Sequence, residues 1–137
     1  MTASIDNLGR VPLFAGLTPP DLERVLEVGK EVRFEPGAPI VEEDQSGVGF
    51  HLILDGRADI FVNGHKVATY GAGEYFGEMS MLDGKPRSAT VVADGPLATL
   101  SIPAWNFESL LEKHPTIMRA LLTELCGRIR RTESIRS

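Results

Sequence analysis

The stretch from Tyr75 to Val91 holds the residues of this chain whose types and spacing could do chemistry. Gly77 and Glu78 stand together, and Arg87 follows nine positions after Glu78. A glycine allows close approach of the backbone, and the N–H groups that follow it would point outward at the start of a short helical turn. Arg87 adds a planar fork of donors suited to phosphate oxygens. The stretch therefore predicts a loop that binds an anion, most simply a phosphate.

Glu78 indicates what else the ligand carries. A carboxylate beside a phosphate is repulsive unless it serves a neutral partner. An ionised carboxylate can only accept hydrogen bonds, so that partner must be a donor such as a hydroxyl. A phosphate and a hydroxyl on one small ligand describe a nucleotide whose ribose keeps a free hydroxyl next to the charged group.

The order of these residues resembles that of a known family. Phe76-Gly77-Glu78-Met79-Ser80, followed by Pro86-Arg87-Ser88-Ala89-Thr90-Val91, resembles the phosphate-binding cassette of cyclic nucleotide-binding domains. The resemblance extends more loosely from Leu13 to Thr132. It implies that Arg87 pairs with the cyclic phosphate and that Glu78 accepts from the ribose 2′-hydroxyl. It also implies further contacts from the backbone of Gly77, Glu78 and Met79, with Phe76 opening the cassette and Ser88 and Ala89 beside the phosphate.

The resemblance also suggests where the base lies. It implies that Ala58 and Ile60 form an apolar wall for the base and that the C-terminal helix closes as a lid. Thr132 matches a threonine that contacts the adenine amino group in catabolite activator proteins, although Glu133 stands where those proteins have a serine. The expected ligand is cyclic AMP. Cyclic GMP is the alternative, because a hydroxyl residue directly after the arginine helps to hold guanine in related kinases.

Several arginines make the C-terminus basic, and they admit two interpretations. The first is a solvated helix face favoured by the helix dipole, and we give it more weight. The second is that one arginine folds over the ligand. The residues are Arg128, Arg130, Arg131 and Arg136.

The composition is that of an ordinary globular chain. With 137 residues and a formal charge of −5, it suits a single domain that lacks the basic surface typical of nucleic-acid binding. An anionic ligand must then be held by local charge. One cysteine, Cys126, fits a reducing compartment and is interpreted as a small core residue. We see no secretory leader and no membrane span, so we expect a cytoplasmic protein.

The elements that must position the cassette can be predicted from periodicity and turn residues. Residues 1–29 indicate a broken helical lead-in, with Thr18 as N-cap of a helix that ends near Gly29. Residues 30–102 alternate with period two and predict a jelly-roll-like β-roll. Residues 103–134 are helical. We predict reversals in the roll at Asp55-Gly56, Asn63-Gly64 and Asp94-Gly95-Pro96. The expected fold is thus mainly β with flanking helices, in one cyclic nucleotide-binding domain over 1–137.

Other functions receive less support. His51, His65 and His114 lack the paired spacing of a metal site and are expected at the surface or, for His114, at a helix end. No nucleophile and base stand in a catalytic arrangement, so we expect neither an enzyme nor a cofactor. The remaining alternatives are a ligand-binding fragment of a larger transcription regulator or channel, and a non-binding dimerisation module. Expected partners are a cyclic nucleotide and either a second copy, through the C-terminal helix, or an effector protein, with no DNA or membrane contact from this chain alone.

Overall fold

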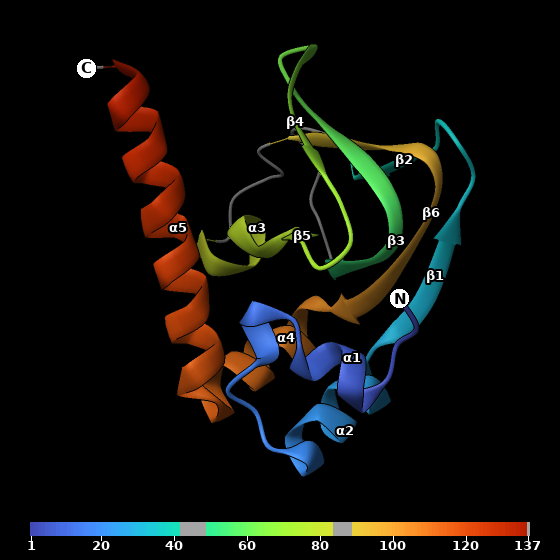
Figure 1. Cartoon of the computed structure of the whole chain (residues 1–137), viewed down its shortest axis with the longest axis vertical. Coiled ribbons are helices and arrows are strands. Elements are labelled where there is room, and N and C mark those ends of the chain that lie inside the picture. The colour runs from blue at the N-terminus through green and yellow to red at the C-terminus, as the bar shows by residue number, and fades with distance from the viewer. Residues whose placement is uncertain (42–48, 84–88, 137) are drawn as a thin grey trace.

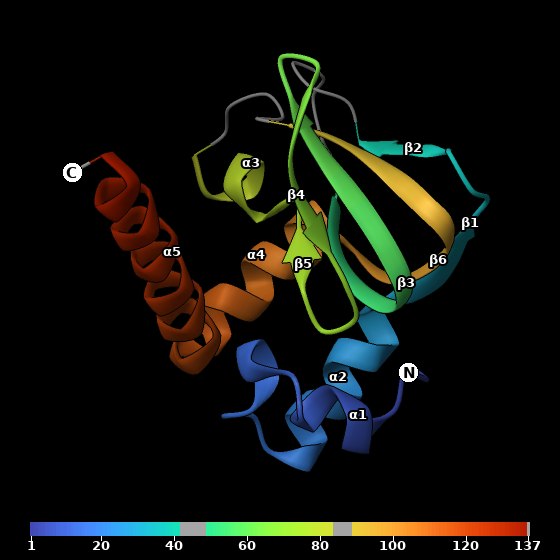
Figure 2. The same ribbon diagram turned by 45° about the horizontal axis from the view of Figure 1, so that its top comes forward.

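The computed structural model describes residues 1–41, 49–83 and 89–136. A strongly curved sheet forms a roll, α1, α2 and α4 gather at one end of it, and α5 runs along its flank (Figures 1 and 2). The helices are α1 (Ile5–Gly9), the 3-10 helix η1 (Pro12–Phe14), α2 (Pro19–Val28), α3 (Glu78–Asp83), α4 (Ala104–Lys113) and α5 (Pro115–Arg136). The strands are β1 (Lys30–Phe34), β2 (Pro39–Val41), β3 (Gly49–Val62), β4 (His65–Tyr70), β5 (Tyr75–Phe76) and β6 (Thr90–Pro103). The predicted fold class is confirmed.

Two long antiparallel strands, β3 and β6, form the spine of the sheet. The strand order is β1-β6-β3-β4, with β2 paired to β6 and β5 paired to β3. Pairing between β3 and β6 runs from Gly49 opposite Pro103 to Phe61 opposite Thr90. Because each of the two strands contributes to the apolar cluster beside the helices and to the one inside the roll, both clusters share one framework.

The predicted reversals at Asp55-Gly56 and Asp94-Gly95-Pro96 are wrong. Both β3 and β6 continue through these positions, and the pairing register shifts there instead. Gly56 has φ +90° and Gly95 has φ +89°, so the two glycines permit a bulge and a bend in strands that stay paired. Asn63 and Gly64 do form the predicted tight turn, with φ values of 51° and 77°, and lead directly into β4.

The bulge decides which core each part of β3 faces. Before it, Leu52 and Leu54 point into an apolar cluster shared with the helices, while Ile53 points into a second cluster inside the roll. After it, Ala58 and Ile60 point into the roll. Even-numbered residues therefore change sides, as one extra residue in a strand requires. The predicted base wall faces the interior of the roll because of this irregularity.

The helical lead-in forms as predicted. Thr18 caps α2 by accepting from the Asp21 N–H, and Gly29 ends the helix with its N–H donating to the Val25 carbonyl. α2 buries Leu22 and Val25 against the helical end of the sheet.

Helix α5 is anchored at its base and exposed beyond it. Ile117 and Leu121 are fully buried, whereas no residue from 122 to 130, all of them within the described part of α5, is buried. Cys126 is exposed, so its interpretation as a core residue is wrong. The apolar periodicity of the helix continues past the point where a core lies beside it. Among the described residues no helix combines the length and apolarity needed to cross a membrane.

Candidate functional site

The cassette begins where β5 passes into α3. Phe76 and Tyr75 pair with His51 and Leu52 of β3, which ties the start of the cassette to the spine of the sheet. Gly77 has φ +96°, a conformation that favours glycine. It turns the chain so that Glu78 becomes the first residue of α3. The predicted short helical turn after Gly77 is therefore present.

Glu78 is a carboxylate that the fold keeps from water. Its exposure is 3%. Burial raises the pKa of Glu78, because desolvation disfavours the charged form, and the neighbouring Arg128 opposes that rise. A buried charge is costly unless it is paired and hydrogen-bonded. Glu78 thus requires a partner, and the structure supplies one from a distant part of the chain.

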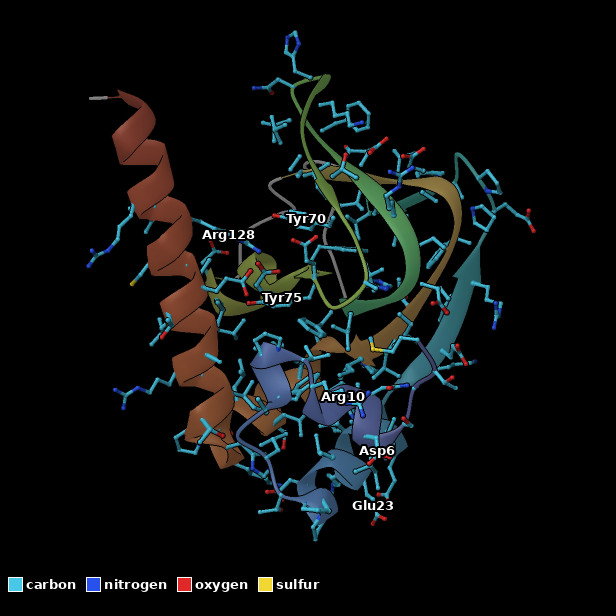
Figure 3. The ribbon with its side chains drawn as sticks, viewed as in Figure 1. Asp6, Arg10, Glu23, Tyr70, Tyr75 and Arg128 are labelled. Carbon is cyan, nitrogen blue, oxygen red and sulfur yellow. The ribbon has the colours of Figure 1, made fainter. Side chains whose placement is uncertain are left out.

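That partner is Arg128 of α5, which contacts two carboxylates and two aromatic rings; Figure 3 shows it beside Tyr70 and Tyr75. Its Nη1 donates to Glu78 Oε1 at 3.1 Å, and its Nη2 donates to Glu124 Oε1 at 2.8 Å. The guanidinium carbon lies 5.6 Å from the centre of the Tyr70 ring and 5.9 Å from that of Tyr75, within the range of cation–π attraction. One side chain on α5 therefore contacts α3, β4 and β5.

Tyr75 connects α5 to the roll by a second route. Its hydroxyl donates to Glu124 Oε2, and its ring packs against Phe50 at 5.5 Å between centroids. Burial and the bond to Glu124 raise the pKa of Tyr75, and burial raises the pKa of Tyr70. Burial therefore favours the neutral phenol at both positions.

The described residues of the predicted base wall share one apolar cluster. Ala58 and Ile60 lie with Phe76 and Val91 inside the roll, and Ala89 packs against the same cluster. Phe76, Ala89 and the predicted wall therefore lie together, and their contacts with a base stay a prediction.

Several predicted site residues cannot be placed in the same way. Arg87 and Ser88 lie outside the described residues, as does the side chain of Met79. Thr132 belongs to α5, four positions and so about one turn beyond Arg128, but its side chain also lies outside the description. The assignment of these residues to ligand contacts stays a prediction.

Residue types and spacing did not indicate Tyr70, Tyr75 or Glu124 as site residues, and they favoured a solvated face for Arg128. For Arg128 that interpretation is wrong. A signal existed in the spacing of Glu124 and Arg128, which stand four apart and so share one helix face. What the pattern could not give is the distance between that face and Glu78, which depends on the angle of α5 to the roll.

His51 also differs from its expected place at the surface. It is half-buried, its ring stacks on Phe76 at 5.1 Å, and its Nδ1 lies 3.0 Å from Thr99 Oγ1. It thereby supports the strand that begins the cassette. His114 ends α4, as expected, and lies 3.7 Å from Asp21 Oδ2.

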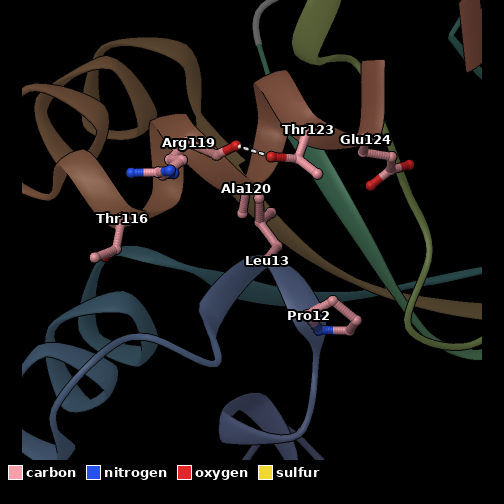
Figure 4. A pocket seen from close by; sticks show the side chains of 7 residues that line it. All are labelled: Pro12, Leu13, Thr116, Arg119, Ala120, Thr123 and Glu124. Carbon is pink, nitrogen blue, oxygen red and sulfur yellow. Dashed lines mark hydrogen bonds between the residues drawn. The ribbon is translucent and has the colours of Figure 1, made fainter. Parts of the chain in front are cut away.

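A groove lies between η1 and α5 (Figure 4). Its lining includes Leu13, Ala120 and Glu124. Glu124 therefore lines the groove, and its two carboxylate oxygens accept hydrogen bonds from Tyr75 and Arg128.

Comparison with protein families and curated proteins gives one consistent result. Residues 31–114, more than half of the chain, match the profile of the family described as "Cyclic nucleotide-binding domain". The cAMP-dependent protein kinase regulatory subunit of Aspergillus niger is 34% identical over 114 residues. The match covers 82% of this chain and only 28% of that protein.

Solved structures show the same similarity. The catabolite activator protein of Thermus thermophilus gives a TM-score of 0.81 at 30% identity, covering 89% of this chain and 60% of that one. The structure described as cAMP bound PfPKA-R gives a TM-score of 0.85 at 26% identity. The match covers 96% of this chain and 45% of that one. The regulatory subunit of a cAMP-independent protein kinase A from Trypanosoma brucei gives a TM-score of 0.81 at 25% identity. The match covers 88% of this chain and 43% of that one. Because that last protein is described as cAMP-independent, similarity to this group of proteins does not by itself fix the ligand.

Proposed function

The chain belongs to the family of cyclic nucleotide-binding domains, and on that premise we propose that it binds cyclic AMP at the cassette and reports occupancy through α5. The supporting observation is Glu78, a buried carboxylate at the head of α3 whose partner, Arg128, comes from α5. The same carboxylate is therefore the proposed acceptor for the ligand and the acceptor for an arginine of α5. The described relatives support cyclic AMP as the nucleotide, with cyclic GMP as the alternative.

The proposed binding mode divides the ligand among three groups of residues. Arg87 and the backbone of Gly77, Glu78 and Met79 hold the phosphate, with Ser88 and Ala89 beside it. The two oxygens of Glu78 can serve two donors, so the ribose 2′-hydroxyl is bound while Arg128 keeps its contact. Ala58 and Ile60 face the base from inside the roll, and Thr132 approaches it from α5.

The proposed signal is a shift in the position of α5. A ligand that binds Glu78 adds a second donor to the carboxylate that Arg128 contacts, so the affinity for the ligand is higher when α5 lies where Arg128 reaches Glu78 than in other positions of the helix. A ligand moves a conformational equilibrium only by such a difference in affinity. The role proposed for the chain is thus that of a regulatory binding module and not of an enzyme.

Titration calorimetry with cyclic AMP, cyclic GMP and 5′-AMP tests this function. We expect the wild type to bind cyclic AMP. Arg87→Ala should weaken this binding by at least ~30-fold, since removing one partner of a buried charge pair costs about 2 kcal/mol or more. Glu78→Gln should weaken it less and reduce the preference for a free 2′-hydroxyl.

Arg33→Ala is the matched control for Arg87→Ala, because the Arg33 side chain is 79% exposed on β1. It should bind cyclic AMP like the wild type. Equal affinity for 5′-AMP and cyclic AMP would contradict a site for the cyclic phosphate, and no binding of any of the three nucleotides would contradict the function itself.

We further propose that α5 pairs with α5 of a second copy. Leu122 and Ile129 are exposed at 54% and 57%, and exposed Cys126 stands between them on the same face. This spacing of four and three residues is the seam of a two-helix coiled coil. An effector protein that covers the same seam is the alternative partner.

A further inference from the structure

We propose that Tyr75 and Glu124 are positioning residues: through their hydrogen bond they orient Arg128 onto Glu78 and hold α5 against the roll. The effect on ligand recognition rests on the function proposed above. The effect on α5 does not, because it concerns contacts within the chain.

The contacts form one connected series. The Tyr75 hydroxyl donates to Glu124 Oε2, Arg128 donates to Glu124 Oε1 at 2.8 Å, and Arg128 donates to Glu78 Oε1 at 3.1 Å. Glu124 therefore uses one oxygen for the roll and the other for the arginine. A carboxylate held at both oxygens has one orientation, and the guanidinium bound to it is directed the same way.

The first member of the series is rigid. Tyr75 is 4% exposed, pairs with Leu52 in the sheet and packs on Phe50. Its hydroxyl is thus fixed by the helical core of the protein. Arg128 and Glu124, by contrast, stand on the part of α5 that has no buried residue among positions 122–130. The fixed hydroxyl of Tyr75 therefore positions the exposed part of α5 through Glu124.

The burial of Glu78 explains why orientation matters there. A buried carboxylate can accept well only from donors that are already aimed at it. If Arg128 loses Glu124, it retains many side-chain rotamers, and Glu78 loses a fixed partner. Glu78 would then be less well placed to accept from a ribose hydroxyl, although neither Tyr75 nor Glu124 need touch the ligand.

The first test compares cyclic AMP with 2′-deoxy-cyclic AMP by calorimetry in Tyr75→Phe, Glu124→Gln and the double variant. Tyr75→Phe removes the hydroxyl and keeps the ring. We expect each single variant to lose ~5-fold more affinity for cyclic AMP than for the deoxy ligand, the size of one hydrogen bond. The double variant should equal the single variants, because all act through one contact.

Glu23→Gln is the matched control. Glu23 is an exposed acid on α2, away from Tyr75 (Figure 3), and its loss should leave both affinities unchanged. A merely structural role for Tyr75 would weaken both ligands together. An unchanged ratio of the two affinities in Tyr75→Phe and Glu124→Gln would overturn the proposal while leaving the proposed function intact.

The second test needs no ligand. The chain has one tryptophan and one cysteine, Trp105 and Cys126, and both are exposed on different helices. Because Cys126 also lies in the seam proposed for pairing of α5, the measurement is made in the Leu122→Glu background, which we expect to be monomeric. There, energy transfer from Trp105 to a dye on Cys126 reports the position of α5 within one chain. We expect the transfer efficiency to change in Tyr75→Phe and Glu124→Gln and not in Glu23→Gln. Unchanged transfer in both variants would overturn the proposal, whether or not the wild type binds a nucleotide.

Discussion

At the scale of single residues, Glu78 shows how this fold uses an unfavourable charge. Burial raises the pKa of Glu78, so the folded chain binds a proton more tightly there than the unfolded chain does. The contribution of Glu78 to the free energy of unfolding therefore falls as pH rises above the ordinary pKa of a glutamate. Arg128 reduces this penalty at neutral pH, and it does so only while α5 lies against the roll.

The two tyrosines allow a direct test of this part of the structure. Tyr70 and Tyr75 are the only tyrosines in the chain, and the pKa of each is raised, by burial and, for Tyr75, also by Glu124. We expect the midpoint of the tyrosinate absorbance to lie above roughly pH 10, the ordinary pKa of tyrosine, and the ionisation to increase on unfolding.

The sign of the linked stability change follows from the same shift. Above roughly pH 10 the unfolded chain loses phenolic protons that the folded chain keeps, so the free energy of unfolding decreases as pH rises. Spectrophotometric titration measures the ionisation, and circular dichroism follows the fold in the same samples. A normal titration in a chain that is still folded would show that the two rings are in water.

At the scale of elements, Gly56 and Gly95 test whether the bends of the sheet are tightly packed. The two have nearly equal φ values, +90° and +89°. A Cβ at Gly56 would lie 2.2 Å from the Pro96 carbonyl oxygen, whereas a Cβ at Gly95 would meet nothing within 4 Å. The two positions share the same backbone strain and differ in the space around them.

We therefore expect Gly95→Ala to lower the free energy of unfolding by about 1–2 kcal/mol, through backbone strain alone. Gly56→Ala should lower it by about 3 kcal/mol or more, since overpacking adds about 1–3 kcal/mol to the strain. Urea unfolding of the two variants measures both values. Equal losses would mean that β3 and β6 do not approach closely at this bend.

These same glycines mark the limit of what the sequence could predict. Turn residues and periodicity gave the helical lead-in, the turn at Asn63-Gly64 and the roll, and the cassette correctly indicated the family. Asp55-Gly56 and Asp94-Gly95 carry the signals of a reversal, but a glycine with positive φ serves a bulge equally well. Only the partner strand decides between them, and the partner lies about forty residues away in the chain.

The site was predictable to the same extent. Glu78, Gly77 and Phe76 are adjacent in the chain, so local spacing was sufficient to group them. Arg128 reaches Glu78 from fifty positions away, and no local pattern carries that distance. The exposure of Cys126 shows the same limit, because periodicity gives the apolar face of a helix but not what covers it.

At the scale of the whole molecule, the exposed seam of α5 predicts association. We expect light scattering to give the mass of a dimer and Leu122→Glu to give that of a monomer, because a charge at the centre of an apolar seam must be desolvated. Val67→Glu is the matched control, since Val67 is an equally exposed apolar residue, at 59%, on β4. A monomeric wild type, or a dimer that survives Leu122→Glu, would contradict pairing through this seam.

The pairing of β1 with β6 also governs how the chain must fold as it is made. Lys30 at the start of β1 lies opposite Ser101 near the end of β6, so the sheet joins segments about seventy residues apart. Contacts of such long range close slowly. Since β6 fills the place between β1 and β3, the roll cannot close during synthesis until the ribosome has released the last strand. Until then the earlier strands have unpaired edges, and in this interval such a chain is most prone to aggregate.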